Sequence, residues 1–393
     1  MKLVLFFTRG VSLERWLQDG IFAREKLLYE RHLADGTLSE IHWLTYGVRD
    51  GEIASRLHVD GRLDDRIQVW PMPRWFAIPR AGSWLYTFML PRVYGGIIRC
   101  ADVLKTNQLD GAWAAAAARK RWSVPLIVRC GYVQSKLEEA LRRLPGWRLR
   151  LMAWGEARAY EAADCAVVAS HHDERYVMRV YRVPADRIRV IPNFIDTRRF
   201  SSAGELPTDE SASRWLFVGR LSPEKNLANL IAACARSGIG LDIVGGGPCQ
   251  ASLRATVRDS GADVRFLGRI DNDDLPDVLR SHRYFILPSM REGNPKTLLE
   301  AMACGLICVG TNVDGIAEVI EDGVDGFLSW GTDVGELCTA MHRAMEAGNR
   351  RVAEAAVRTV NNRNGIDRCL HAERDVLREL ARSPGTSHDG SSR

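Results

Sequence analysis

The chain has 393 residues, of which 46% are hydrophobic, which is enough for two domains and too many for one ordinary domain. Its longest apolar run, residues 81–90, stops before Pro91 and is shorter than the roughly 18 to 20 residues of a membrane-spanning helix. The nine cysteines include no C-x-x-C pair, which favours a reduced, intracellular compartment.

The first half of the chain is its basic half. Residues 1–200 hold 32 Lys and Arg against 22 Asp and Glu, and nine of the eleven tryptophans. Two interpretations of this excess of basic residues and tryptophans are equally good: solvated arginines around an aromatic core, or a surface that binds an anionic partner.

The chain opens with a short apolar run at residues 3–7, too short for the core of a signal peptide, which predicts a buried strand. Beyond it, runs rich in Val, Ile and Phe alternate with segments of helical period, a pattern typical of parallel sheets built from β-α-β units. The strands expected in the first half are residues 3–7, 40–46, 66–70, 101–106, 125–130, 165–169 and 187–191.

Residues 196–213 are rich in Ser, Asp, Glu, Thr, Gly and Pro and predict a linker between two domains. We therefore predict an α/β protein with a Rossmann-like domain at residues 1–198 and another at residues 199–382, whose last helix could pack back on the first domain. Residues 383–393 contain no apolar side chain and predict a disordered tail. The strands expected in the second domain are residues 215–218, 241–244, 264–267, 284–287 and 307–310.

The residues that follow each strand are the candidate site, because ligands in open α/β sheets bind beyond the carboxyl ends of the strands. Gly219 and Arg220 follow one strand, and Lys225 comes five residues after Arg220. A diphosphate fits between two such cations, which stabilise the charge that grows on a nucleoside-diphosphate leaving group. Without an anion, cations near a helix N-terminus are unfavourable.

The next turn, residues 245–247, consists of three glycines. It would let a ligand approach the backbone at Gly246, although turns of this kind also arise for purely geometric reasons.

A third segment, residues 288–305, places Glu292 in a loop and Glu300 on the helix that follows. Pro295 suits the start of that helix, whose first amides then point toward an anion. In this position Glu300 could accept hydrogen bonds from ribose hydroxyls, while Glu292 reaches the sugar.

Five segments between residues 188 and 328 form one pattern, and together they resemble family 4 of the retaining glycosyltransferases. These segments are Val190-Ile-Pro-Asn-Phe-Ile-Asp196, Gly219-Arg-Leu with Lys225-Asn226, the Gly-Gly-Gly-Pro turn, Phe266-Leu-Gly268, and the two glutamates separated by seven residues.

The resemblance implies the GT-B fold of two facing Rossmann-like domains and the transfer of a sugar from a nucleotide-sugar donor to a saccharide or lipid-linked acceptor. The product would belong to glycan, exopolysaccharide or lipopolysaccharide synthesis. It also implies front-face attack without a metal, with Arg220, Lys225 and Glu292 as the catalytic set. The donor-binding residues that it implies are Gly219, Gly246, Gly268, Ile270, Gly293, Asn294, Pro295, Lys296, Thr297 and Glu300.

The first half resembles the family more loosely. Many relatives carry a histidine after the strand that ends here at Cys130; this chain has none, and Arg129 is the candidate substitute. Phe194 replaces a usual glycine and Ile307 a common proline, and we expect neither to touch the site chemistry. The candidates on the acceptor side are Arg9, Gly10, Asn107, Gln108 and Arg129.

Two other functions stay open: a nucleotide-sugar epimerase of similar fold, and a catalytically silent subunit that binds nucleotide-sugars. An NAD dehydrogenase is disfavoured because no G-x-G-x-x-G follows the first strand. Residues 271–274 (Asp-Asn-Asp-Asp) and 171–173 (His-His-Asp) favour helix starts over metal sites. We expect no metal, no cofactor and no nucleic-acid partner, since the nucleotide-sugar is a substrate.

Two aromatic, arginine-rich segments, residues 70–96 and 141–154, could lie on an anionic bilayer without crossing it. Alternatively, both pack on the core and leave their arginines solvated. We expect a cytoplasmic protein, with peripheral association at the inner face of the membrane as the further option.

Overall fold

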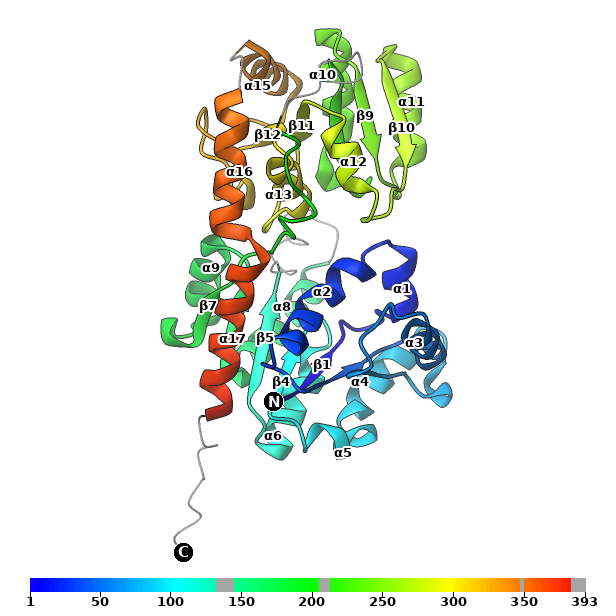
Figure 1. Ribbon diagram of the computed structural model, residues 1–393. Coiled ribbons are helices and arrows are strands. Elements are labelled where there is room, and N and C mark those ends of the chain that lie inside the picture. The colour runs from blue at the N-terminus through cyan, green and yellow to red at the C-terminus, as the bar shows by residue number, and fades with distance from the viewer. Residues whose placement is uncertain (132–144, 205–212, 347–349, 383–393) are drawn as a thin grey trace, which may run out of the picture. The chain divides into compact units, whose positions relative to one another are not determined.

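The structure, a computed structural model, describes residues 1–131, 145–204, 213–346 and 350–382. The chain divides into two compact units, coloured in chain order in Figure 1. Unit 1 holds residues 1–169, 173–191 and the described residues from Leu370 onward, and unit 2 holds residues 170–172 and 192–369. The predicted tail at residues 383–393 and residues 205–212 of the predicted linker lie outside the described residues.

Unit 1 contains a seven-stranded parallel sheet with strand order β3-β2-β1-β4-β5-β6-β7. Every residue of β4 and β6 is buried, as expected for parallel strands with helices on both faces. All seven predicted strands are confirmed. They are β1 (Lys2–Phe6), β2 (Glu40–Leu44), β3 (Ile67–Trp70), β4 (Val103–Thr106), β5 (Leu126–Cys130), β6 (Cys165–Val168) and β7 (Ile188–Val190).

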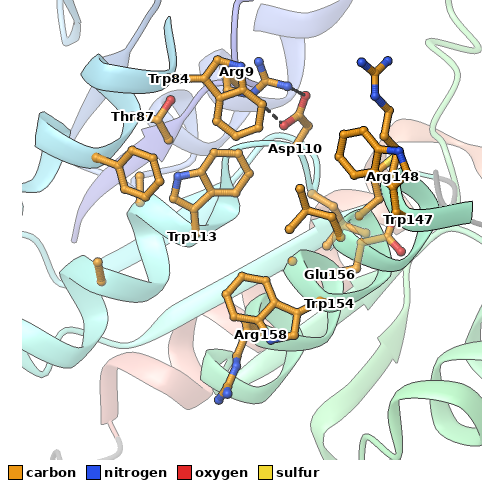
Figure 2. Close-up of a pocket in the computed structure, with 17 residues that line it drawn as sticks. Arg9, Trp84, Thr87, Asp110, Trp113, Trp147, Arg148, Trp154, Glu156 and Arg158 are labelled. Atoms are coloured by element: carbon orange, nitrogen blue, oxygen red, sulfur yellow. Dashed lines mark hydrogen bonds and ion pairs between the residues drawn. The ribbon is translucent and has the colours of Figure 1, made fainter. Parts of the chain in front are cut away.

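The helices of unit 1 carry an aromatic surface as well as the connections between strands. Trp84 of α4 stacks on Trp113 of α6 with ring centroids 5.4 Å apart (Figure 2). The helices that lie wholly or mostly in this unit are α1 (Leu13–Gln18), α2 (Phe22–Ala34), α3 (Asp50–Val59), η1 (Arg74–Phe76), α4 (Gly82–Val93), α5 (Gly95–Ile98), α6 (Ala112–Trp122), α8 (Gly146–Ala162), α9 (His171–Tyr181), η2 (Ala185–Arg187) and α17 (Ile366–Arg382).

A buried ion pair ties helix α17 to the sheet of unit 1. Lys105 of β4 pairs with Glu373 of α17, and their side chains are only 2% and 4% exposed. Burial by itself raises the pKa of Glu373, but the positive charge of Lys105, assisted by His32 and Arg129, holds it below its ordinary value. Because a buried charge is costly without its partner, the pair requires this part of α17 to stay against the sheet of unit 1, where Val376 and Leu377 are also buried.

Unit 2 contains a six-stranded parallel sheet with strand order β10-β9-β8-β11-β12-β13. The five predicted strands are confirmed, and β13 was not predicted. It pairs with β12 alone and contains only two apolar residues, Phe327 and Leu328, before Ser329, which is too short a run for a periodic signal. The strands are β8 (Trp215–Val218), β9 (Leu241–Val244), β10 (Val264–Gly268), β11 (Tyr284–Leu287), β12 (Ile307–Thr311) and β13 (Phe327–Ser329).

The helices of unit 2 bury one face against this sheet. Helix α10 shows how the sequence achieves this, since Leu227, Leu230, Ile231 and Cys234 recur at helical spacing and are all buried. The helix ends at Gly238, whose φ of 65° is left-handed, a conformation that glycine adopts readily. The helices are η4 (Pro223–Lys225), α10 (Leu227–Ser237), α11 (Gln250–Ser260), α12 (Leu275–Arg280), α13 (Lys296–Ala303), α14 (Asp314–Ala317), α15 (Val334–Glu346) and α16 (Arg350–Asn364).

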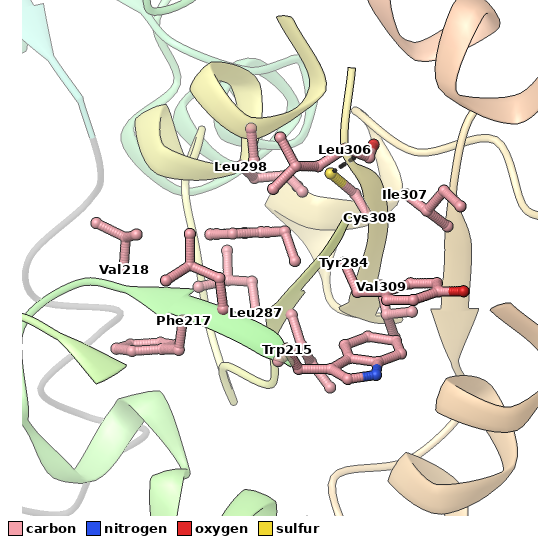
Figure 3. Close-up of a cluster of buried hydrophobic side chains, with 14 of the residues drawn as sticks. Trp215, Phe217, Val218, Tyr284, Leu287, Leu298, Leu306, Ile307, Cys308 and Val309 are labelled. Carbon is pink, nitrogen blue, oxygen red and sulfur yellow. Dashed lines mark hydrogen bonds between the residues drawn. The ribbon is translucent and has the colours of Figure 1, made fainter. Parts of the chain in front are cut away.

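The core of unit 2 is centred on β8, β11 and β12 (Figure 3). The rings of Trp215 and Tyr284 stack with their centroids 4.9 Å apart, and Phe217 and Leu298 are fully buried in the same cluster. Stacked, buried aromatic rings contribute more to stability than their buried area alone, so this pair fastens β8 to β11 at the amino ends of both strands.

Among the described residues, no helix is both long and apolar enough to span a membrane.

Candidate active site

The strand order places the predicted site residues of each unit at its topological switch point. The order reverses between β8 and β11 in unit 2, and between β1 and β4 in unit 1. At such a point neighbouring connections leave toward opposite faces and open a crevice at the carboxyl ends of the strands. Arg220, Lys225 and Glu292 follow β8 or β11, whereas Arg9 and Asn107 follow β1 or β4.

The loops after β8, β9 and β10 are connected through their backbones. The amide of Leu221 donates to the carbonyl of Gly246 at 3.0 Å, and that of Gly245 to the carbonyl of Gly268 at 2.7 Å. A Cβ atom at Gly245 would lie 1.9 Å from the carbonyl oxygen of Gly219. The packing of adjacent loops therefore explains the glycine at 245, and ligand approach at Gly246 stays a prediction.

Lys225 and Glu292 meet in the structure, although 67 residues separate them in the chain. Lys225 ends the short helix η4, and its ammonium group forms an ion pair with Glu292 Oε1. The hydroxyl of Ser289 donates to the same oxygen at 2.7 Å. The side chains of Lys225 and Glu292 are 19% and 13% exposed, so both are mostly buried and a small part of each reaches the surface. Arg220 is exposed.

Helix α13 begins at Lys296, directly after Pro295, as predicted. Glu300 lies one turn inside it, with the residue only 1% exposed. At the start of the helix Lys296 Nζ lies 5.3 Å from the ring centroid of Phe194. Phe194 thus contacts a predicted donor-binding residue, contrary to the expectation that this substitution leaves the site untouched.

The loop before α13 is anchored at Asn294. The side-chain oxygen of Asn294 accepts from the amide of Asn193 at 3.0 Å, which joins two of the family-like segments. Gly293 and Thr297 are partly buried beside it, and Ile270 is partly buried at the end of the β10 loop.

Three residues that support Glu292 were not predicted: Ser289, Thr311 and Gly315. The Thr311 hydroxyl donates to the backbone carbonyl of Ser289. A Cβ atom at Gly315 would lie 2.1 Å from the carbonyl oxygen of Gly293, so only glycine lets α14 approach this loop. Thr311 ends β12 and Ser289 comes two residues after the end of β11, and the sequence does contain this signal.

The candidates in unit 1 lie at the carboxyl edge of its own sheet. Arg9 makes a two-pronged ion pair with Asp110, at 3.0 and 2.9 Å, and the amide of Gly131 donates to Gln108 Oε1 at 2.9 Å. Gly10 is exposed with a φ of 77°. The amide of Arg129 donates to Thr106 Oγ1 at 3.1 Å.

The acidic run at residues 271–274 starts a helix, as predicted, because α12 follows with Asp274 as its N-cap residue. Within residues 1–131, 145–204, 213–346 and 350–382, no cluster of three or more His, Cys, Asp or Glu side chains could hold a metal ion.

Comparisons with known proteins agree with this architecture. The family model for Glycosyltransferase Family 4 matches residues 40–199, and that for Glycosyl transferases group 1 matches residues 200–359. A D-inositol 3-phosphate glycosyltransferase from Acidothermus cellulolyticus is 30% identical over 310 residues, covering 71% of this chain and 68% of that protein. The chain belongs to glycosyltransferase family 4. Two more relatives of this glycosyltransferase are also D-inositol 3-phosphate glycosyltransferases, and the matches cover 63% and 62% of their length.

Two further proteins show how widely the resemblance extends. The alpha-maltose-1-phosphate synthase of Mycobacterium tuberculosis is 26% identical to this glycosyltransferase over 350 residues, covering 82% of this chain and 90% of its own. The structure of Anabaena HepE in complex with UDP aligns with a TM-score of 0.73 over 96% of this chain and 100% of that one, at 18% identity. The latter likeness confirms the GT-B fold.

Proposed function

We propose that this enzyme transfers a sugar from a nucleoside-diphosphate sugar to a saccharide or lipid-linked acceptor, with retention of the anomeric configuration. The observation that carries the proposal is the pairing of Lys225 with Glu292 beside the start of α13, at the switch point of unit 2. This arrangement offers a cation and the amides of a helix N-terminus to an anion, and a carboxylate to a neutral sugar. The presence of UDP in the HepE structure supports a nucleoside diphosphate.

In the proposed step, the acceptor oxygen bonds to the anomeric carbon as the bond from that carbon to the donor phosphate oxygen breaks. The acceptor hydroxyl proton passes to the departing phosphate oxygen, so no enzymic base is required. Arg220 and Lys225 neutralise the charge that develops on the diphosphate, and interactions that strengthen in the transition state are those that raise the rate. Ser289 and Lys225 hold the Glu292 carboxylate for the sugar.

Transfer of a labelled sugar from UDP-sugars to a panel of saccharide and polyprenyl-phosphate acceptors tests this proposal. We expect a product whose anomeric configuration, read by NMR, equals that of the donor, and we expect saturating chelator to leave the rate nearly unchanged. An inverted product would contradict the mechanism, as would activity that chelator removes and magnesium or manganese restores. Epimerised donor without transfer would identify an epimerase, and binding without turnover a silent subunit.

We also propose that unit 1 associates with an anionic membrane surface. Trp84 and Phe88 of α4 are 43% and 64% exposed, and Trp147 and Trp154 of α8 are 63% and 59% exposed. Of the 17 residues in α8, only Glu156, Ala159 and Tyr160 are buried, so most of this helix faces outward. Large exposed aromatic side chains with arginines nearby are typical of interfacial helices.

Flotation with liposomes tests this association. Binding is expected to require anionic lipid, to fall with added salt, and to weaken when Arg148 and Arg150 of α8 are changed to glutamine, since each basic residue contributes about 1 kcal/mol near an anionic surface. Arg142 and Arg143 of the same predicted segment lie outside the described residues. Arg258→Gln, an exposed arginine of unit 2, is the matched control. Equal recovery with neutral and anionic liposomes would contradict the proposal.

A further inference from the structure

A cavity of about 820 Å³ lies in unit 1 between α4 and α6 on one side and α8 on the other (Figure 2). We call it the α4–α6–α8 groove. Its walls are mainly apolar, with Trp84 and Trp113 stacked on one side and Trp147 and Trp154 of α8 on the other. Its volume is within the range of small-molecule binding sites, which are likewise apolar with few polar groups.

The wall formed by α8 is a continuous stripe. Trp147, Leu151 and Trp154 recur at spacings of four and three residues, which places them on one face of the helix. Each of these side chains is more than half exposed. A core would bury such residues, whereas a contiguous exposed apolar surface marks the place of a ligand or partner.

One end of the groove lies at the carboxyl edge of the sheet. Arg9 follows β1 and Asp110 follows β4, and both line the groove. Helix α8 ends just before β6 begins, so its first turn lies near the same edge and its last turn near the opposite edge. From Trp147 to Arg158 the lining therefore extends about 16 Å away from the edge at which acceptor candidates gather.

The groove has a net positive charge at that same end, where Arg9 and Arg148 outnumber the one carboxylate, Asp110, with which Arg9 is paired. The guanidinium carbon of Arg9 lies 4.0 Å from the ring centroid of Trp84, and that of the exposed Arg148 lies 5.2 Å from the ring centroid of Trp147. Figure 2 shows Arg9 and Arg148 at one end, with Trp154 and Arg158 toward the other. An anionic headgroup thus fits at the sheet edge, and an apolar chain fits along the helices.

We propose that the α4–α6–α8 groove binds the hydrocarbon chain of a phosphate-bearing lipid acceptor, with the phosphate end near Arg9 and Arg148. The proposal rests on the proposed glycosyl transfer and adds the class of acceptor. A peptide occupant would bring N–H and C=O groups that need hydrogen-bond partners, and walls of Trp, Phe, Leu and Ala provide few. A hydrocarbon chain needs none.

Binding of dodecyl phosphate below its critical micelle concentration, followed by calorimetry and by tryptophan fluorescence, tests the groove directly. Inorganic phosphate and decyl maltoside are the comparison ligands, and both are expected to bind at least about tenfold more weakly because each lacks either the chain or the charge. UDP is titrated in parallel as the probe of the donor site.

Ala117→Glu is the decisive variant. Ala117 is an exposed residue of α6 that lines the groove, and glutamate is a good helix former, so the thermal unfolding midpoint should not change. A carboxylate among apolar walls should lower the affinity for dodecyl phosphate at least about tenfold. Ala251→Glu, at an exposed alanine of α11 in unit 2, is the matched control and should bind like the unaltered protein.

Four outcomes would overturn the assignment of the groove. Dodecyl phosphate could bind Ala117→Glu as tightly as the unaltered chain, or inorganic phosphate could bind as tightly as dodecyl phosphate. The unaltered protein could instead self-associate at low concentration and lose this association in Ala117→Glu, which would make the groove an interface between copies. Retained UDP binding with no binding of dodecyl phosphate would contradict the groove alone, whereas absence of both nucleoside-diphosphate binding and sugar transfer would contradict the proposed transfer.

Discussion

Lys225→Ala is expected to lower kcat at least about tenfold, and by more than Arg220→Ala does. Each charge-assisted contact to the diphosphate is worth about 1.5 to 3 kcal/mol, or roughly a 10- to 100-fold rate effect when it acts only in the transition state. The difference between the two variants has a structural cause. Lys225 pairs with Glu292, whose side chain is only 13% exposed, so its removal also leaves a poorly solvated carboxylate beside the leaving group.

The measurement is steady-state transfer by each variant, with the unfolding midpoint as a check on the fold. Arg220→Lys is expected to lose activity too, because the planar fork of donors is lost. Arg258→Ala, an exposed arginine of the same unit, is the control. Normal kinetics in Arg220→Ala and Lys225→Ala would refute the donor-site assignment. In the Lys225→Ala, Glu292→Gln double variant the two losses should not add, because the residues are in contact.

Glu292 and Glu300 are expected to have different roles. Glu300→Gln should weaken binding of the nucleoside diphosphate roughly tenfold, because a neutral amide is a poorer partner for two hydroxyl donors than a carboxylate. Glu292→Gln should lower kcat while the free nucleotide still binds, since Glu292 addresses the sugar, which the nucleotide lacks.

Calorimetry with UDP, together with kinetics for each variant, distinguishes these roles. Glu336→Gln, at an exposed position of α15, controls for the change of charge. If Glu292→Gln abolished nucleotide affinity and Glu300→Gln left it intact, the two assignments would have to be exchanged. The structure gives one reason to expect a mixed effect at position 292, because loss of its charge also loosens Lys225.

The confirmed strands and helices show how much of the secondary structure local sequence patterns can predict. Twelve of the thirteen strands in the described part of the chain could be predicted, because most of them are buried on both faces and form continuous apolar runs. The strand β13 was missed, because its apolar run ends after Phe327 and Leu328. The start of α13 after Pro295 and the start of α12 after Asp274 could also be predicted, because proline and acidic residues indicate a helix start from the residues next to it in the chain.

The contacts that assemble the candidate site were not local. That Lys225 meets Glu292 depends on β8 lying beside β11, and this order follows from packing the whole sheet. Ser289, Thr311 and Gly315 support the same loop for reasons that only the neighbouring chain segments reveal.

The sequence by itself determined the α/β class, the repeated Rossmann-like architecture and the residues at the strand ends, because apolar periodicity and turn chemistry act over a few residues. Only the tertiary structure decided that Glu373 of the last helix lies against Lys105, 268 residues earlier, and that α4, α6 and α8 enclose an apolar groove. The physical reason is that a side chain is chemically the same whether it faces a core, a ligand or water. Which of these it faces is set by elements far away in the chain.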